Sequence, residues 1–328
     1  MQLVCRKCAA AFQHKERTQN LTILRSEFGA VKQSKSEPFL FDATSAASSN
    51  VMACVSLMIT SICIIHRLFF LCKPILKGHP MIKFHRILLL ILGAVFLAST
   101  TGIARYAADS CTQSRMYRQL AALTENFPGD AASPGNDFLP QYQALYAQNS
   151  DLAGWIQIDG TNINYPVMQS KQNPDFYLKH NFEKANSPHG CPYVQASCDL
   201  QTPSDNILVY GHNMKDGTMF SDLLQYKRES FWEQHRIIQF DTLTAQAEYT
   251  VMAVFRGEAE DLFAYYQCTD AETPQEFVAY VDACKNAALY DTGVTAAYGD
   301  KLLTLSTCDD SGKNSRMVVV AKRITEPR

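Results

Sequence analysis

The sequence predicts a mostly β fold whose strands close, or nearly close, into a barrel, with helices ahead of it and one helix inserted late. Short runs rich in β-branched and aromatic residues alternate with turn-forming residues such as those at 159–160. The runs are WIQID, NINYPVM, NILVYGH, RIIQFD, AEYTVMAVF, KLLTLSTC and RMVVVAKRI. Between the fifth and sixth runs, apolar residues recur at helical spacing over residues 273–289. Several short strands with one late helix are typical of such a barrel.

Two helical segments are expected ahead of the strands. Apolar residues are spaced as in a helix over residues 114–127, and a second, shorter helix is expected over residues 138–151. The intervening stretch FPGDAASPGND is rich in proline, glycine and small residues, which indicates a linker or a helix break. We therefore expect a helical stalk or linker over residues 105–148 and one β domain over residues 149–326.

Residues 87–104 form an apolar stretch without charge or proline. Its length is at the short end for a membrane-spanning helix of about 20 residues. Lys83, His85 and Arg86 precede it, so the positive-inside rule places its N-terminal side in the cytoplasm and the chain after Arg105 outside. A cleaved signal peptide is the alternative, but the apolar core is longer than usual for one. The pattern favours a basic flank and an uncleaved anchor over residues 81–104.

A second apolar stretch, at residues 51–72, is interrupted by His66-Arg67 and could also span the membrane, which would give two passes. The sequence from Met81 onward nevertheless reads as a complete membrane-targeting N-terminus. We therefore hypothesise that residues 1–80 are an upstream extension from a mis-assigned start. N-terminal sequencing of the native protein tests this hypothesis, and a native chain starting at Met1 contradicts it.

The composition argues against several classes of protein. The formal net charge is −2, so no bulk electrostatic feature points to nucleic acid. The 11 cysteines are odd in number and scattered, unlike those of a small disulfide-stapled domain. The single CxxC at residues 5–8 lacks a second cysteine or histidine pair, so a zinc site is not expected there.

A cysteine and an arginine stand on either side of the loop DDSGKNS. In KLLTLSTC, strand alternation puts Thr304, Ser306 and Cys308 on one face, with the thiol at its end. Arg316 opens the next run, and a hairpin across the turn-rich loop would bring its guanidinium close to the thiol. A cation there favours the thiolate and offers donors to a developing oxyanion.

A nucleophilic thiol needs an acid or base partner, normally histidine. His212 ends the apolar run NILVYGH and begins a polar loop, which is a typical place for a catalytic group. His180, His189 and His235 stand in polar surroundings and are expected to be solvated surface residues. Cys308, His212 and Arg316 would each be read as structural alone, but together they favour a catalytic site.

These segments resemble the class B sortases. The resemblance rests on TLSTC at 304–308, the arginine eight residues later, YGHNMKDGTMFSDL at 210–223, NSDLAGWIQIDGTNINYPVMQS at 149–170 and DFYLKHNF at 175–182. It covers roughly residues 140–324 and implies a membrane-anchored cysteine transpeptidase of the Gram-positive cell surface, with an eight-stranded barrel as catalytic domain. The implied roles are nucleophile for Cys308, general acid/base for His212, and binding of the substrate carbonyl or oxyanion for Arg316. No cofactor and no metal are implied.

Further residues receive expectations from the same resemblance. Ser306 and Asn213 are taken as substrate-binding, although the Ser306 hydroxyl could instead bond within the barrel. Asp309 could orient the histidine, but a solvated loop carboxylate is the simpler interpretation. The segment GCPYVQASCDL departs from the family pattern, and a Cys191–Cys198 disulfide is one outcome that the sequence leaves open.

The implied substrate is a secreted protein with a C-terminal sorting signal similar to Asn-Pro-x-Thr-x. The implied acceptor is an amine of peptidoglycan or a pilin lysine. Two alternatives remain at this point. An L,D-transpeptidase-like enzyme has the same order of His, Cys and Arg, although its cysteine usually follows a glycine. A non-catalytic, membrane-tethered binding module would keep Cys308 as a core thiol. A papain-like peptidase needs its cysteine ahead of its histidine, opposite to this chain.

Overall fold

The computed structural model describes residues 81–125, 138–258, 262–309 and 314–324. The chain from Leu88 onward forms one compact unit. The apolar stretch at 51–72, the proposed extension over 1–80 and the expected linker at 127–137 lie outside the described residues.

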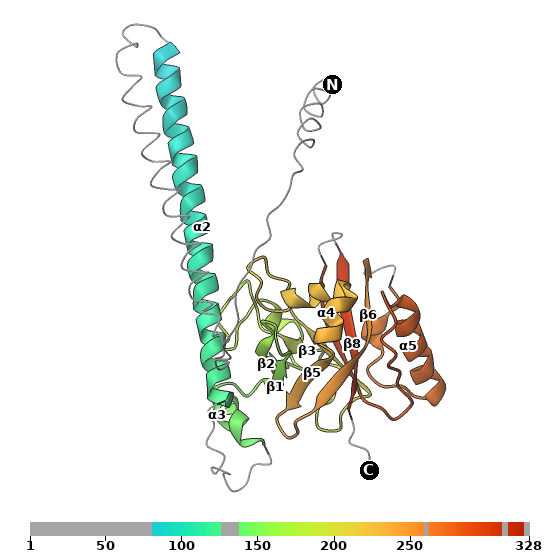
Figure 1. The fold of residues 1–328 in the computed structure, drawn as a ribbon. Helices are drawn as coiled ribbons and strands as arrows, with labels where there is room; N and C mark the ends of the chain where they lie inside the picture. Colours follow the sequence, from blue (N-terminus) through green and yellow to red (C-terminus); the bar gives the residue numbers. More distant parts are fainter. Residues whose placement is uncertain (1–80, 126–137, 259–261, 310–313, 325–328) are drawn as a thin grey trace, which may run out of the picture. The chain divides into compact units, whose positions relative to one another are not determined.

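Eight strands close into a barrel in the order β1-β2-β3-β4-β7-β8-β6-β5 (Figure 1). Neighbouring strands are antiparallel except for two parallel pairs, β2 with β3 and β4 with β7. The strands are β1 (Leu152–Gln157), β2 (Asn164–Met168), β3 (Tyr193–Val194), β4 (Asn206–Tyr210), β5 (Ile237–Thr242), β6 (Glu248–Glu258), β7 (Leu302–Cys308) and β8 (Ser315–Arg323). The predicted fold class is therefore confirmed. The sequence runs had indicated every strand except β3, which has only two residues.

Strand β7 is buried on both faces, so its sequence reads as an almost continuous apolar run. One face carries Leu303 and Leu305, while the other carries Thr304 and Ser306. The hydroxyl of Thr304 donates to the Asn206 side chain at 2.8 Å, which satisfies its hydrogen-bonding capacity inside the protein. The hydroxyl side of β7 is thus held by specific hydrogen bonds.

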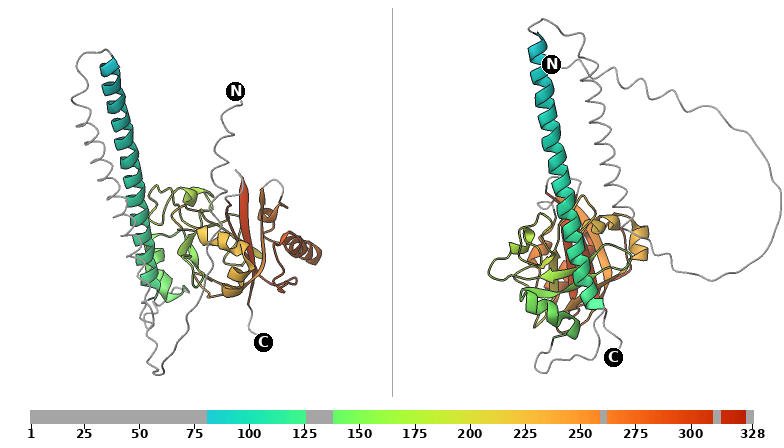
Figure 2. Two further views of the ribbon diagram at one scale, coloured as in Figure 1. Left: turned by 45° about the horizontal axis from the view of Figure 1, so that its top comes forward. Right: turned by 90° about the vertical axis from the view of Figure 1, so that its left-hand side faces the viewer.

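The late helix is α5 (Pro274–Ala287), which packs against β6 (Figure 2). Thr273 caps its N-terminus by accepting a hydrogen bond from the Glu276 backbone N–H, and Pro274 occupies the first turn. Its buried face includes Tyr280, whose hydroxyl accepts a 3.0 Å hydrogen bond from the Asn206 amide on β4. The helix therefore covers the barrel beside β4 and β7.

Helix α2 (Met81–Glu125) is continuous through the expected anchor and the following helical segment. Within the described part of the chain, one helix is long and apolar enough to cross a membrane, Ile87–Glu125. Apolar side chains near its start are exposed, Leu90 by 74%, whereas Tyr117, Leu120 and Ala121 are buried in the core of the domain. The same helix thus has an apolar exposed part and a part packed on the barrel.

The remaining helices are short. They are α3 (Pro140–Gln148), α4 (Glu229–Gln234), and the 3₁₀ helices η1 (Phe176–Leu178), η2 (Ser221–Lys227) and η3 (Tyr265–Gln267). Helix α3 falls within the range expected from the sequence. Two of the 3₁₀ helices lie next to His212, which follows the end of β4. The Leu178 carbonyl of η1 is hydrogen-bonded to the His212 side chain, and η2 begins directly after the loop that starts at His212.

Candidate active site

Cys308 and Arg316 face each other across the β7–β8 hairpin. Strand β7 ends at Cys308, and the pairing register places Arg316 directly opposite. Directly opposed residues of an antiparallel pair have Cα atoms about 5 Å apart. The six residues of β7 before Cys308 are buried, whereas Cys308 itself is exposed. The strand therefore presents its thiol to solvent beside a guanidinium.

His212 reaches the same edge of the barrel through the parallel pairing of β4 with β7. Tyr210 is paired with Ser306, and the Gly211 N–H donates to the Ser306 carbonyl at 3.2 Å. His212 and Cys308 each follow that pair by two residues, so the parallel strands deliver both side chains to one edge. The sequence could place either residue at a strand end, but only the β4–β7 pairing brings them together.

A hydrogen bond fixes the His212 ring. Its Nε2 lies 2.7 Å from the carbonyl oxygen of Leu178 in η1. Since a carbonyl oxygen can only accept, Nε2 carries the proton. In the neutral ring this leaves Nδ1 as the basic nitrogen, which is the state that a general base requires.

Gly211 is required by the packing next to the histidine. A Cβ at this position would lie 2.6 Å from the ring of Phe220. The Phe220 N–H also donates to the His212 carbonyl at 2.8 Å, so the loop folds back onto its own start. A side chain at residue 211 would push Phe220 away and loosen this closure.

Cys308, His212 and Arg316 line one cleft of about 390 Å³. Tyr193 and Tyr210 form part of its wall, with ring centroids 5.6 Å apart. Burial raises the pKa of both tyrosines, so both phenols stay neutral at physiological pH. The cleft therefore combines an exposed thiol, an imidazole and a guanidinium with an uncharged aromatic wall.

Comparison with known proteins identifies the family to which this chain belongs. The sequence model of the sortase domain matches residues 156–324. Sortase B of Staphylococcus aureus is 36% identical over 187 residues, covering 56% of this chain and 75% of that protein. Sortase B of Listeria monocytogenes is 32% identical over 207 residues, covering 62% and 80%. The structure of a Staphylococcus aureus sortase B–substrate complex superposes with a TM-score of 0.60 at 30% identity, covering 67% of this chain and 100% of that one.

The chain belongs to the sortase family. Its relatives place it in class B, and it is therefore a cysteine transpeptidase, as the resemblance implied. The family match favours this activity over the L,D-transpeptidase and over the non-catalytic binding module. Sortases act on secreted proteins and on an acceptor related to peptidoglycan.

Two residues of this sortase were expected to bind substrate. Ser306 lines the cleft, but it is 2% exposed and its hydroxyl lies 2.9 Å from the Tyr265 hydroxyl. This bond gives the buried Ser306 hydroxyl a partner inside the protein, so its presence does not require a contact with substrate. The side chain nevertheless borders the cleft. Asn213 follows His212 and forms an isolated β-bridge with Met219. Contact of either residue with substrate stays a prediction.

Asp309 is not the solvated loop carboxylate that the sequence suggested. Its side chain is fully buried, and its carboxylate pairs with Lys227 of η2 and, at 3.5 Å, with Arg256 of β6. Its backbone N–H donates to the Ser315 carbonyl at 2.9 Å, which continues the hairpin beyond Cys308. The expectation was wrong because both cations come from distant parts of the sequence. Asp309 ties the end of β7 to the barrel wall.

Cys191 and Cys198 are free thiols, so the disulfide left open by the sequence is not formed. Both side chains are buried, and each sulfur bonds a different carbonyl, that of Pro166 at 3.4 Å and that of Asn206 at 3.6 Å. Burial raises the pKa of Cys191 to about 12 and that of Cys198 to about 11. These buried thiols stay protonated and inert, whereas the Cys308 thiol is exposed.

His189 is buried and is therefore not the solvated surface residue that the sequence predicted. It is 1% exposed, and its Nε2 lies 2.8 Å from Asp216 Oδ2. Its polar sequence surroundings concealed this burial because the partner belongs to the loop after β4.

Within the described ranges, no group of three or more His, Cys, Asp or Glu side chains could hold a metal ion.

Proposed function

We propose that this sortase cleaves the sorting signal of a secreted protein after threonine and transfers the new carboxyl end to an amine, with Cys308, His212 and Arg316 as its catalytic residues. One observation carries the proposal. The exposed thiol at the end of β7 stands directly opposite Arg316 and shares a cleft with His212. Nucleophile, proton carrier and oxyanion donor thus meet at one edge of the barrel.

In the first half-reaction, the Cys308 thiol passes its proton to Nδ1 of His212 while the sulfur attacks the threonine carbonyl carbon and a C–S bond forms. Arg316 donates hydrogen bonds to the tetrahedral oxyanion. Collapse of this intermediate breaks the C–N bond, and His212 gives its proton to the departing amine. The product is a thioacyl enzyme and a released C-terminal fragment.

In the second half-reaction, an acceptor amine attacks the thioester carbonyl. His212 takes the proton from the amine, the new amide C–N bond forms and the C–S bond breaks. The released thiolate then takes this proton from His212, which regenerates the Cys308 thiol and the neutral ring. Because His212 alternates between acid and base, its ring must keep one orientation through both steps. The hydrogen bond from Nε2 to the Leu178 carbonyl supports that orientation.

The proposed signal is similar to Asn-Pro-x-Thr-x, and the proposed acceptor is a peptidoglycan amine or a pilin lysine. The uncharged aromatic wall formed by Tyr193 and Tyr210 suits an extended peptide with a proline. Ser306 and Asn213 are proposed to contact this peptide, Ser306 from within the cleft. A peptide-library assay run with each kind of acceptor amine shows whether the cleaved peptide is transferred to a peptidoglycan amine or to a pilin lysine.

The proposed location is the cell membrane, with one pass and the barrel outside. Residues 87–104 of α2 would extend about 27 Å as a helix, close to the roughly 30 Å hydrocarbon core of a bilayer. Lys83 and Arg86 precede this stretch and would stay on the cytoplasmic side. The exposed apolar side chains of this part of α2 support the assignment.

The proposal is tested with the full chain in detergent micelles and a quenched Asn-Pro-x-Thr-x peptide library. Cys308→Ala should abolish cleavage and the thioacyl adduct seen by mass spectrometry. Cys268→Ala is the matched control, because Cys268 is a second exposed cysteine outside the cleft lining. Full activity of the Cys308→Ala protein rules the mechanism out.

A further inference from the structure

The histidine loop, residues His212–Phe220, is a compact turn held largely by its own backbone. Its ends meet through the 2.8 Å bond from the Phe220 N–H to the His212 carbonyl, and the Gly217 N–H donates to the Met214 carbonyl at 3.0 Å. The barrel holds it through the Met219 N–H, which donates to the Tyr165 hydroxyl at 3.1 Å. These bonds connect the tip of the loop to His212 through a short, hydrogen-bonded stretch of backbone.

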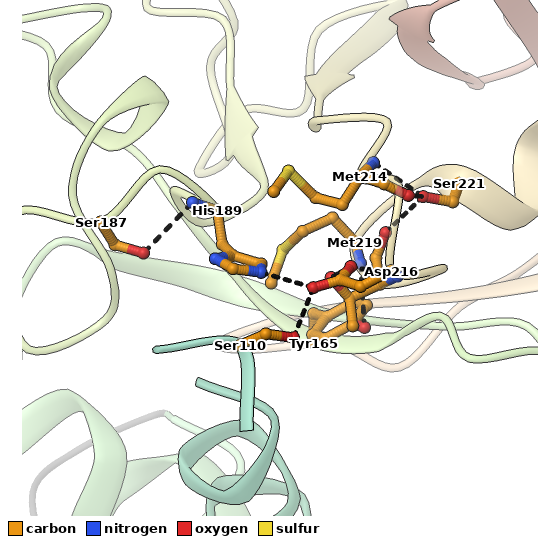
Figure 3. A network of polar contacts seen from close by, with 9 residues as sticks. Ser110, Tyr165, Ser187, His189, Met214, Asp216, Met219 and Ser221 are labelled. Atoms are coloured by element: carbon orange, nitrogen blue, oxygen red, sulfur yellow. Dashed lines mark hydrogen bonds and ion pairs between the residues drawn. The ribbon is translucent and has the colours of Figure 1, made fainter. Parts of the chain in front are cut away.

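At the tip of the histidine loop, Asp216 contacts Ser110 and His189, as Figure 3 shows. Its Oδ2 accepts a 2.5 Å hydrogen bond from Ser110 of α2 and lies 2.8 Å from His189 Nε2. Its Oδ1 accepts bonds from the Thr218 N–H and hydroxyl at 3.1 and 2.6 Å. The Asp216 side chain is only 17% exposed and that of His189 is fully buried.

The protonation of Asp216 agrees with this geometry. Partial burial acts to raise the pKa of its carboxyl, but the hydrogen bonds from Ser110, Thr218 and His189 outweigh it and lower the pKa to about 2. The carboxylate is therefore ionised at any physiological pH, and its bond to the helix persists.

The acceptor of the His212 hydrogen bond is attached to α2 too. Leu178 belongs to the segment 176–191, which is braced by the Cys191 N–H donating to the Tyr177 carbonyl at 2.9 Å. The buried hydroxyl of Tyr117 on α2 donates to the Gly190 carbonyl of this segment at 2.7 Å. Helix α2 thus supports both the loop that carries the imidazole and the segment whose Leu178 carbonyl accepts the hydrogen bond from Nε2.

Around Tyr117, α2 is packed tightly against the barrel domain. Tyr117 is 2% exposed, and its ring meets that of Tyr165 edge-on at a centroid distance of 5.3 Å. Tyr165 is the same residue that bonds the histidine loop through Met219. The helix, the barrel and the loop therefore meet at one aromatic contact.

We infer that α2 sets the orientation of His212 for proton transfer, with Ser110, Asp216 and Tyr117 acting as positioning residues. The inference rests on the proposed role of His212 as acid and base. It assigns to the anchor helix a part in catalysis in addition to attachment.

The test compares variants of the full chain in detergent micelles, using steady-state cleavage of the quenched Asn-Pro-x-Thr-x library peptide that is turned over best. Ser110→Ala and Tyr117→Phe each remove one hydroxyl, and the double variant removes both. Thr112→Ala and Tyr142→Phe are matched controls, because Thr112 bonds only within α2 and Tyr142 bonds Asp241. Ser110→Thr restores a hydroxyl at the helix contact. His212→Ala is measured alongside.

The double variant should lose about tenfold in kcat, as expected when a general acid is misplaced, with the KM for peptide unchanged within about twofold. Ser110→Thr should recover most of the Ser110→Ala loss, and both controls should match the wild type. Because a partly unfolded sample would also lower the apparent kcat at unchanged KM, the folded fraction of each variant is measured by circular dichroism and kcat is expressed per folded enzyme. A loss of folding stability alone then leaves this kcat unchanged.

Two outcomes overturn the inference and are distinct. If His212→Ala is inactive while the double variant keeps the wild-type kcat, α2 does not position the histidine and the proposed mechanism stands. If His212→Ala is fully active, the proposed role of His212 fails and the positioning role fails with it.

Discussion

The histidine loop and the β7–β8 hairpin flank the same cleft, but different contacts hold them. The hairpin is fixed by Asp309, whose fully buried carboxylate pairs with Lys227 and Arg256 of the same barrel domain. The histidine loop is fixed by Asp216, which bonds Ser110 on α2 and the buried His189. The Cys308 side of the cleft thus depends on the barrel, whereas the His212 side depends also on a helix outside it.

The largest expected effect is on the Cys308 side of the cleft, at the proposed oxyanion donor Arg316. Arg316→Ala should lower kcat for peptide cleavage by about 10²–10³-fold, the usual cost of one oxyanion donor. Arg316→Lys should recover only part of this loss, because lysine keeps the charge without the planar fork of donors. Arg323→Ala, at the far end of β8, is the control and should behave as wild type. An Arg316→Ala protein with normal kcat would remove Arg316 from the mechanism.

Asp309→Asn should come next and should act mainly on stability. The amide cannot neutralise Lys227 and Arg256, so the free energy of unfolding should fall by about 1–3 kcal/mol. Chemical denaturation monitored by circular dichroism measures the change. Asp300→Asn, which breaks a pair with the partly exposed Lys322, should cost less than about 1 kcal/mol. Equal losses in the two variants would show that the Asp309 pairs behave as surface pairs.

Gly211→Ala tests the histidine side by packing alone. The added Cβ meets the Phe220 ring, and such overpacking costs about 1–3 kcal/mol or displaces the ring. We expect kcat to fall about tenfold, because the closure of the histidine loop loosens. Phe220→Leu in the Gly211→Ala background should restore part of the activity by making room. A double variant no better than Gly211→Ala would contradict this packing account.

The smallest effect is the pH dependence of the Asp216 contact. Hydrogen bonds lower the pKa of Asp216 in the folded protein to about 2, from its usual value of 3.8. Its stabilisation is therefore fully present above about pH 4 and is lost as pH falls toward 2. The difference in Tm between wild type and Asp216→Asn should be constant above pH 4 and vanish near pH 2. A difference that stays unchanged down to pH 2 would mean that the carboxylate charge contributes nothing.

The sequence predicted the features that depend on local pattern. Strand alternation and turn residues predicted the hairpin that opposes Cys308 and Arg316, and helical spacing predicted α5. A strand end before a polar loop singled out His212. Each of these signals lies within one short segment, so no knowledge of distant contacts was needed.

The features that the sequence did not predict depend on contacts between segments far apart in the chain. The burial of Asp309 requires Lys227 and Arg256, and that of His189 requires Asp216, none of which is adjacent in sequence. Strand β3 has two residues, too few for a periodic signal, and exists through pairing with β2 and β4. A polar segment around a histidine or aspartate reads as solvated until its partner is known.

With α2 as the proposed membrane anchor, its continuity would limit the distance between the active site and the bilayer. Ser110 follows Ala104 by six residues, about 9 Å along a helix axis. With residues 87–104 in the bilayer, the histidine loop is held within about two helical turns of the lipid surface. In the proposed membrane location, a rigid spacer of this length would confine the enzyme to a thin layer above the membrane. It would thereby raise the effective concentration of any substrate tethered in the same membrane, compared with an enzyme on a long flexible linker.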